Sequence, residues 1–455
     1  MGLVFAIIII FMPIVTNIGI SEAEMASATS SHNLNLQALF SGDFVNAPYL
    51  FLQKLSIHLF GLTFFAIKLP SIILGILSGF LAVLLLNRWF TTSVAVIASI
   101  LTISTTGFLF AATTGTPVIS YLLFLSLTLW LGSKILNETP SPLISAMLAT
   151  TFGLMLYMPY MFCLIIIIII VSFSHPHLRF SIKTLPKPQL ILSFILFGLV
   201  ISPIIASFLI APATAFNHIA VFGDVNFAEN LKTALALFAF KSTENLPVLV
   251  PIISLPTTLI ACASLVLAFK DHHTSRNYIL LSFLLFSVAV LLVAPDLFVI
   301  ILIPIAILVA DGVQFLVNHW NMVFPNNSYA KFISMLPIIV FTFFLACSSV
   351  MYHFFGYRSL KEVNMFYDND LTLVRQNINK SDVLLITDDS LRLDFYHILE
   401  DKMQISVVDK MPDRIESQVL VFRNNTAQLD GDLSLRRIVT SDRYDNSDRL
   451  YIFEK

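Results

Sequence analysis

Charged residues are scarce in this chain of 455 residues: Asp, Glu, Lys and Arg make up 12% of it, whereas apolar residues make up 57%. The mean hydropathy is +0.86. An ordinary soluble domain carries about twice that share of charge. The scarcity excludes an ordinary soluble protein and indicates a multi-pass membrane protein. No nucleic-acid partner is expected.

Cysteine is scarce as well, with only 3 in the chain. Cys163, Cys262 and Cys347 all stand within apolar runs, where a thiol behaves as a small hydrophobic side chain. The sequence therefore suggests neither a disulfide framework nor a cysteine metal site.

Acidic residues are rarest in residues 1–356, which hold 10 of the 28 Asp and Glu and 12 of the 26 Lys and Arg. The rest of the charge lies in residues 357–455, so we expect a transmembrane domain over 1–356 and a soluble domain over 357–455. The soluble part shows no glycine-rich phosphate loop. Asp388, Asp389 and Ser390 stand where a strand meets a helix, and we interpret them as a helix cap rather than a site. The expected helix covers 390–401, and the expected strands of this small α/β domain cover 383–387, 405–408, 418–422, 433–439 and 449–453.

The apolar runs predict about eleven transmembrane helices, because about 20 helical residues cross the hydrocarbon core. The first run, 3–20, lacks the basic start of a signal peptide, so we favour a retained helix over a cleaved peptide. The long run 142–173 could be one tilted helix, but Pro159 is a natural break, so we favour two spans. The predicted spans are 3–20, 66–87, 91–110, 117–136, 142–157, 159–173, 190–210, 247–269, 278–294, 297–317 and 332–353.

Eleven spans put the two termini on opposite sides of the membrane. With the N-terminus in the cytoplasm, eight basic residues of the membrane domain fall in cytoplasmic connections and four fall outside. This orientation predicts an inner (cell) membrane protein with three extracytoplasmic parts, the loops 21–65 and 211–246 and the domain 357–455. The C-terminal domain should then lie over the first loop.

The first outer loop begins with Ser21, Glu22 and Glu24. Ser21 and Glu24 have the spacing of a capping box at the start of a helix, which gives Glu24 a structural role. Glu22 has no such role, and about 200° of helical rotation separates it from Glu24. A carboxylate at the membrane boundary can act as a general base or bind a divalent cation, and Glu22 is the better candidate. The alternative is a solvated interfacial glutamate.

Residues 46–61 predict an amphipathic helix that lies along the membrane interface. Lys54 and His58 are four residues apart on one face of it, where they could contact an anionic lipid headgroup. The alternative is a lysine and a histidine that simply reach water. Elsewhere, Asp311 lies inside an apolar run and should be paired with a cation.

The order of these motifs resembles the GT-C superfamily of integral-membrane glycosyltransferases, in the branch of protein O-mannosyltransferases and lipid A aminoarabinose transferases. The likeness covers about residues 1–350. It is carried by SEAEMASA at 21–28, Ser41-Gly42-Asp43, Asn46-Ala47-Pro48, Leu59-Phe60-Gly61, Lys68-Leu69-Pro70-Ser71, TTGTPVISYLLF at 113–124 and PDLFVIILIPIAILVADG at 295–312.

The resemblance implies transfer of a sugar from a polyprenyl-phosphate donor, with inversion, to a glycan, lipid or protein acceptor outside the cytoplasm. It gives the acidic role to Glu22, with Glu24 as second choice, and leaves open whether a divalent cation takes part. The family's basic positions are substituted here, as by Asn46 and Asp296. The donor phosphate would therefore be held by Lys54, His58, Lys68 or a residue of the loop 211–246, in which His218 and Asp224 are the candidate substrate-binding residues.

Two other functions remain open at this point. The substituted positions also fit a catalytically inactive relative that binds a lipid-linked glycan or scaffolds envelope enzymes. A transporter is the weaker alternative, because no paired discontinuous helices occur in matching halves of the chain.

Overall fold

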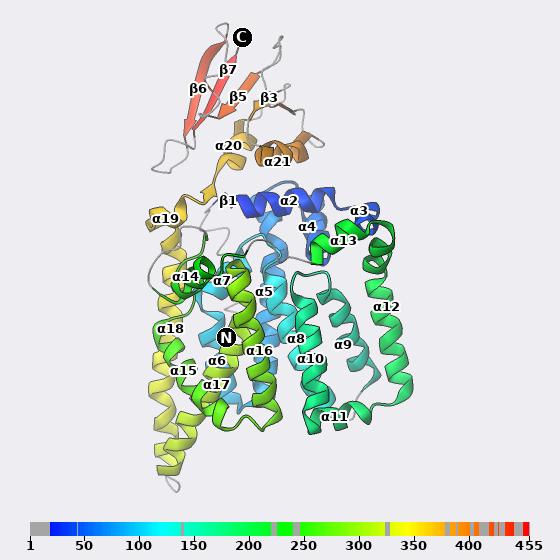
Figure 1. Ribbon diagram of the computed structural model, residues 1–455. Coiled ribbons are helices and arrows are strands. Elements are labelled where there is room, and N and C mark those ends of the chain that lie inside the picture. The colour runs from blue at the N-terminus through cyan, green and yellow to red at the C-terminus, as the bar shows by residue number, and fades with distance from the viewer. Residues whose placement is uncertain are drawn as a thin grey trace.

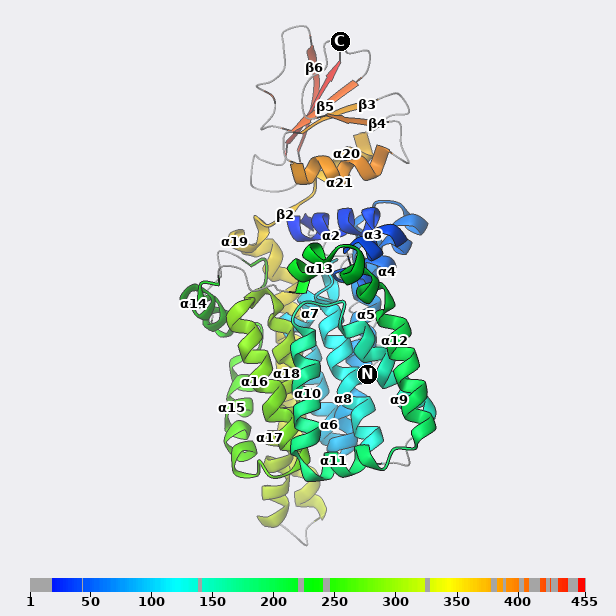
Figure 2. The ribbon, with the colours of Figure 1, turned by 45° about the vertical axis from the view of Figure 1, so that its right-hand side comes forward.

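A computed structural model describes residues 19–42, 44–137, 141–219, 225–239, 246–323, 328–377, 383–387, 390–400, 405–408, 418–422, 426, 433–440 and 449–454. It shows an upright bundle of helices, a layer of short helices across one end, and a small sheet beyond that layer (Figure 1). A view turned by 45° shows the same three levels (Figure 2).

The bundle contains the helices that the apolar runs predict. Within the described ranges, 6 helices are long and apolar enough to cross a membrane, or up to 8 if each of two bent pairs is one span. The break at Pro159 is confirmed, whereas the first predicted span lies outside the described residues. The bundle elements are α5 (Phe64–Trp89), α6 (Thr92–Ile103), α7 (Thr106–Thr113), α8 (Ile119–Asn137), α9 (Pro142–Met155), α10 (Met161–Ser174), α11 (Pro176–Lys183), α12 (Lys187–Ile210), α15 (Leu255–Lys270), α16 (Ser275–Val293), η1 (Pro295–Ile301), α17 (Leu302–Val323) and α18 (Ser328–Ser359).

Two predicted spans are wrong in part. The span predicted over 247–269 is helical only from Leu255, and the span predicted over 91–110 is wrong in its shape. Residues 91–110 do not form one helix, because α6 ends at Ile103 and α7 begins at Thr106 after a bend of 65°. The hydroxyl of Thr105 accepts a hydrogen bond from the Phe108 backbone N–H and so caps the new helix. Polar side chains at 104–106 thus restart the helix within an apolar run.

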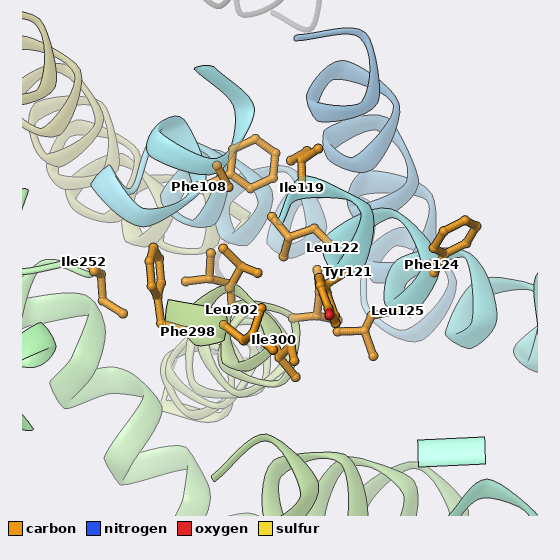
Figure 3. Close-up of a cluster of buried hydrophobic side chains, with 14 of the residues drawn as sticks. Phe108, Ile119, Tyr121, Leu122, Phe124, Leu125, Ile252, Phe298, Ile300 and Leu302 are labelled. Carbon is orange, nitrogen blue, oxygen red and sulfur yellow. The ribbon is translucent and has the colours of Figure 1, made fainter. Parts of the chain in front are cut away.

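The core of the bundle lies around η1 and α17. In the most apolar stretch of that helix pair 83% of the residues are buried, against 11% for α12 and 6% for α18, which present their apolar side chains outward. Figure 3 shows Phe298 and Ile300 of η1 packed with Phe108, Tyr121 and Leu122 from α7 and α8. Asp311 of α17 is paired, as predicted, with Arg276 at 2.7 Å.

The layer across the end of the bundle comes from the two loops predicted to lie outside. Its helices are α2 (Glu22–Asn33), α3 (Leu36–Ser41), α4 (Ala47–Phe60), α13 (Pro212–Ile219) and α14 (Phe227–Phe238). On helix α4 the predicted apolar side, Leu52, Leu55 and Leu59, is exposed, whereas Gln53 and Ile57 are buried.

The C-terminal part is a five-stranded sheet with helices, which confirms the predicted α/β fold. The strand order is β4-β3-β5-β7-β6, with β3 parallel to β4 and β5, and β7 antiparallel to β5 and β6. Its elements, with the segment that leads into it, are α19 (Lys361–Asn364), β2 (Tyr367–Asp368), α20 (Asp370–Asn377), β3 (Val383–Ile386), α21 (Ser390–Glu400), β4 (Ile405–Val408), β5 (Gln418–Phe422), β6 (Ser434–Thr440) and β7 (Arg449–Glu454).

The C-terminal part contacts the first loop directly. Strand β1 (Ile20–Ser21) pairs antiparallel with β2, and α21 packs on α2. Buried side chains of both parts, including Met25 and Ala28 of α2 and Phe395 and Tyr396 of α21, form one apolar cluster. Residues 20–28 are thus in direct contact with the C-terminal part.

Candidate active site

The start of α2 has the predicted capping box. The Ser21 hydroxyl accepts a hydrogen bond from the Glu24 backbone N–H at 3.4 Å, and the Glu24 carboxylate accepts one from the Ser21 backbone N–H at 2.9 Å. Glu22 is exposed and Glu24 is fully buried, so the two carboxylates face different ways, as their spacing predicts.

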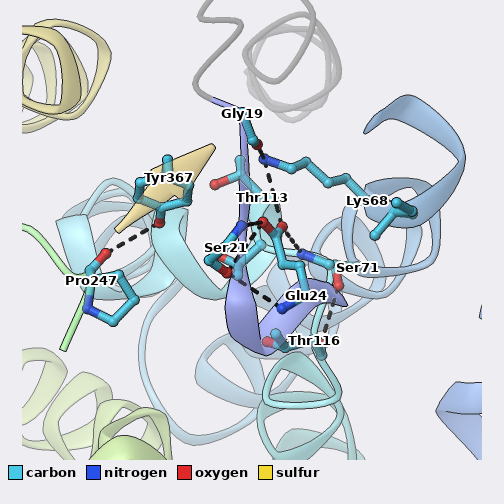
Figure 4. Close-up of polar contacts among 12 residues, drawn as sticks. Gly19, Ser21, Glu24, Lys68, Ser71, Thr113, Thr116, Pro247 and Tyr367 are labelled. Atoms are coloured by element: carbon cyan, nitrogen blue, oxygen red, sulfur yellow. Dashed lines mark hydrogen bonds and ion pairs between the residues drawn. The ribbon is translucent and has the colours of Figure 1, made fainter. Parts of the chain in front are cut away.

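The Glu24 carboxylate is the centre of a buried polar cluster (Figure 4). One oxygen, Oε1, accepts a hydrogen bond from the Gly115 backbone N–H at 2.6 Å and lies 3.5 Å from Lys68 Nζ. Lys68 also donates to the Gly19 carbonyl at 2.9 Å, and its ammonium lies 5.8 Å from the centre of the Tyr367 ring. A buried carboxylate and a buried ammonium are thereby paired and hydrogen-bonded, which offsets the cost of removing both from water.

Close packing at Gly115 makes the hydrogen bond to Glu24 possible. A Cβ at this position would lie 2.7 Å from Ile67 Cγ2 and 2.8 Å from the Ile67 carbonyl oxygen, so a side chain would push the loop away. Gln53 of α4 fastens the same loop, since its amide nitrogen donates to the carbonyls of Gly115 and Ile67 at 2.9 and 3.1 Å. Its oxygen accepts from Ser27 of α2 at 2.7 Å. Four separate segments therefore meet at Glu24.

A second polar chain runs beside this cluster. The Tyr49 hydroxyl lies 2.8 Å from Ser71 Oγ, and Ser71 donates to the Thr116 carbonyl at 3.3 Å. Burial raises the pKa of Tyr49, so its phenol keeps its proton at neutral pH. Burial likewise raises the pKa of Tyr367. Both phenols act as neutral groups next to the Glu24–Lys68 pair.

Of Lys54, His58 and Lys68, three of the side chains proposed for the donor phosphate, both lysines have identified partners within the protein. Lys54 donates to the carbonyls of His32 and Leu34, at the C-terminal end of α2, where a positive charge is favourable. Lys68 is paired with Glu24. His58 is exposed on α4, so it is the most accessible of the three.

The second loop contributes less to the described structure. His218 lies in α13, but its side chain and Asp224 fall outside the described residues, as does Asp43. Within the described ranges, no three His, Cys, Asp or Glu side chains come together as a group that could hold a metal ion. Asp296 lies at the start of η1 and is exposed.

Several members of the cluster are not apparent from the sequence. Gln53, Tyr49 and Tyr367 lie in it, and nothing in their local sequence distinguishes them from other interfacial polar residues. Gly115 could have been found, because TTGT interrupts a long apolar region and belongs to the motif order that carries the resemblance.

The comparisons with known proteins agree with this architecture. Residues 47–206 match the family model for dolichyl-phosphate-mannose-protein mannosyltransferase. No curated protein matches the sequence.

Solved structures match the fold over nearly the whole chain. ArnT from Cupriavidus metallidurans, bound to undecaprenyl phosphate, aligns with a TM-score of 0.55 and 13% identity over 99% of this chain and 97% of ArnT. Its apo structure aligns with a TM-score of 0.57. The oligosaccharyltransferase AglB from Archaeoglobus fulgidus, in complex with an inhibitory peptide and a dolichol-phosphate, aligns with a TM-score of 0.51 and 13% identity, over 89% of this chain and 63% of AglB. At these identities the similarity establishes a shared fold.

Proposed function

We propose that this chain, which has the GT-C fold of integral-membrane glycosyltransferases as its sequence predicts, transfers a sugar from a polyprenyl-phosphate-linked donor to an acceptor outside the cytoplasm. The observation that carries the proposal is the meeting of three family-like segments at one place. SEAEMASA supplies Glu24, KLPS supplies Lys68 and TTGT supplies Gly115, and the Glu24 carboxylate contacts both of the other two. The structures of ArnT with undecaprenyl phosphate and of AglB with a dolichol-phosphate support a lipid-linked donor.

Glu22 is the proposed general base. Its carboxylate is exposed in the first turn of α2, so an acceptor hydroxyl can reach it. Glu22 takes the proton of that hydroxyl as the oxygen bonds to the anomeric carbon, and the bond from that carbon to the donor phosphate breaks. Polyprenyl phosphate leaves with the electrons of the broken bond. A single displacement of this kind inverts the anomeric configuration.

Glu24 holds Glu22 in place under this proposal. Its buried carboxylate has no exposed surface, and it ties the first turn of α2 to α5 and to the loop between α7 and α8. His58, with its exposed ring on α4, is the first of the proposed phosphate contacts to test, and Lys54 remains the second.

A transfer assay in proteoliposomes tests the proposal. Purified protein receives a panel of polyprenyl-phosphate sugars with extracts of envelope glycans, lipids and proteins as acceptors. We expect Glu22→Gln to lower turnover by about 10²- to 10⁴-fold, the usual contribution of a general base. Glu362→Gln is the matched control, because Glu362 is also an exposed glutamate in the first turn of an outer helix. Equal turnover of Glu22→Gln and Glu362→Gln would remove Glu22 from the mechanism.

The second candidate function is a catalytically inactive relative that binds a lipid-linked glycan or scaffolds envelope enzymes. The observation that favours it is the mutual neutralisation of Glu24 and Lys68, which leaves a leaving phosphate with few nearby cations. Donor binding without turnover for every sugar in the panel would support this candidate, and transfer of any sugar would exclude it.

A further inference from the structure

The two residues that precede Glu22 pair with strand β2, which leads into the C-terminal part. Ile20 pairs with Asp368 and Ser21 pairs with Tyr367 in the two-stranded sheet β1–β2. Helix α2 begins at the next residue, Glu22. The backbone that carries the proposed base is therefore fixed on one side by α2 and on the other by a strand from the C-terminal part.

Strand β2 is in turn held by an arginine of helix α21. Arg392 of α21 donates to Asp368 Oδ2 at 2.7 Å and to Asp370 Oδ2 at 3.0 Å. The other oxygen of Asp368 accepts from the Asp370 backbone N–H at 2.6 Å. The side chains of Asp368 and Asp370 are 12% and 3% exposed, so the guanidinium of Arg392 pairs with two largely buried carboxylates, and its removal would be costly.

Strand β2 also contacts the membrane domain. The Tyr367 ring packs edge to face on Tyr357 of α18, with centroids 5.5 Å apart, and its hydroxyl donates to the Pro247 carbonyl at 3.2 Å. Arg375 of α20 donates to the Leu62 carbonyl, between α4 and α5. β2 therefore lies between the bundle, the first loop and the C-terminal sheet, and a shift of β2 would displace β1.

We propose that Arg392, with Asp368 and Asp370, forms a latch through which the C-terminal domain positions Glu22. The inference rests on the proposed function for its catalytic part, but the mechanical link between the latch and residues 20–24 can be tested without it. The C-terminal domain would then be part of the catalytic apparatus, through the strand pair, in addition to any role in acceptor choice. Arg392 is a positioning residue in this scheme, because Glu22 is the group that meets the acceptor.

Kinetics of the full chain test the catalytic part. We expect Arg392→Gln to lower kcat by about 10- to 10²-fold, the usual effect of a small misplacement of a catalytic group, with the KM for the donor unchanged. In the Glu22→Gln background the same substitution should have no further effect on residual turnover. Asp368→Asn keeps the acceptor for the Asp370 N–H and should show a smaller effect. The control is Arg436→Gln. It breaks the exposed ion pair between Arg436 of β6 and Glu454 of β7, and it should leave kcat unchanged.

The results separate a positioning role from a general folding role. An equal fold loss in the wild-type and Glu22→Gln backgrounds would overturn the proposal, because a folding defect lowers both rates alike. Unchanged kcat in Arg392→Gln would overturn it as well.

Hydrogen–deuterium exchange gives a readout independent of activity. We expect the peptide covering residues 19–33 to exchange at least several-fold faster in Arg392→Gln than in wild type, and at the wild-type rate in Arg436→Gln. If wild type transfers no sugar at all, the proposed function fails and this measurement alone decides the latch. Unchanged exchange of residues 19–33 in Arg392→Gln would then refute it.

Discussion

The Glu24–Lys68 pair allows a quantitative prediction about stability. Both side chains are almost fully buried, at 0% and 8% exposure, and their charged atoms lie 3.5 Å apart. At that distance, and with an effective dielectric constant of about 20, the attraction is about 5 kcal/mol. Glu24→Gln removes the attraction, leaves the ammonium unneutralised, and replaces one acceptor oxygen by an amide donor that faces a backbone N–H. Because breaking one side of a buried pair usually costs about 3–5 kcal/mol, we expect a loss of that size in the unfolding free energy.

Unfolding in mixed micelles, followed by tryptophan fluorescence against the fraction of denaturing detergent, measures this loss. Glu22→Gln is the matched control, since the same chemical change on an exposed glutamate two residues away should leave stability unchanged. The double variant Glu24→Gln/Lys68→Met should recover part of the loss, because no buried charge remains unpaired. The reasoning is refuted if Glu24→Gln is as stable as Glu22→Gln, or if the double variant is less stable than the sum of the two single changes.

Three further predictions concern other parts of the chain. Gly115→Ala should destabilise the protein by about 1–3 kcal/mol through overpacking against Ile67. The control is Gly132→Ala, which should leave stability unchanged because a Cβ there meets nothing within 4 Å. The thermal unfolding midpoints of the two variants are compared. Partial burial by itself raises the pKa of Glu400, but hydrogen bonds from the Val407 N–H and from His397 outweigh it and lower that pKa. The stability that Glu400 contributes is therefore present above its unfolded pKa of about 4.3 and lost as pH falls through the folded value, so Glu400→Gln should lower the midpoint at pH 7 and reduce its loss on acidification. In a cysteine-free background, an impermeant maleimide should label Arg436→Cys in intact spheroplasts and should label His177→Cys only after permeabilisation; the reverse pattern would invert the predicted orientation.

Much of the bundle could be predicted because, in a membrane, the local sequence determines where most helices lie. Each apolar run must be helical to satisfy its own backbone, so run length and interruptions set most helix positions. Pro159 marks a real break for this reason. The bend between α6 and α7 was missed, although Ser104, Thr105 and Thr106 signal it, because their hydroxyls can cap a new helix inside an otherwise apolar run.

The candidate site could be predicted only in part. The capping box follows from four consecutive residues, and the opposite faces of Glu22 and Glu24 follow from helical geometry. The partners of Glu24 do not follow, because Lys68 and Gly115 lie 44 and 91 residues away in the chain. Lys68 shows the consequence: its charge indicated a phosphate contact, whereas its buried position places it beside a carboxylate.

The pairing of β1 with β2 changes how the C-terminal domain should be viewed. Two residues per strand form too short a sheet to be stable alone, so β1–β2 persists only because both strands are attached to larger packed elements. Those elements are α2 and the C-terminal part with its helix α21, and they also share an apolar cluster. The pairing of β1 with β2 therefore depends on the relative position of the bundle and the C-terminal domain. Any acceptor or partner that moved this domain would also move the residues next to Glu22. Under the proposed function, ligand binding at the C-terminal domain and donor binding at the first loop are expected to be thermodynamically linked for this reason.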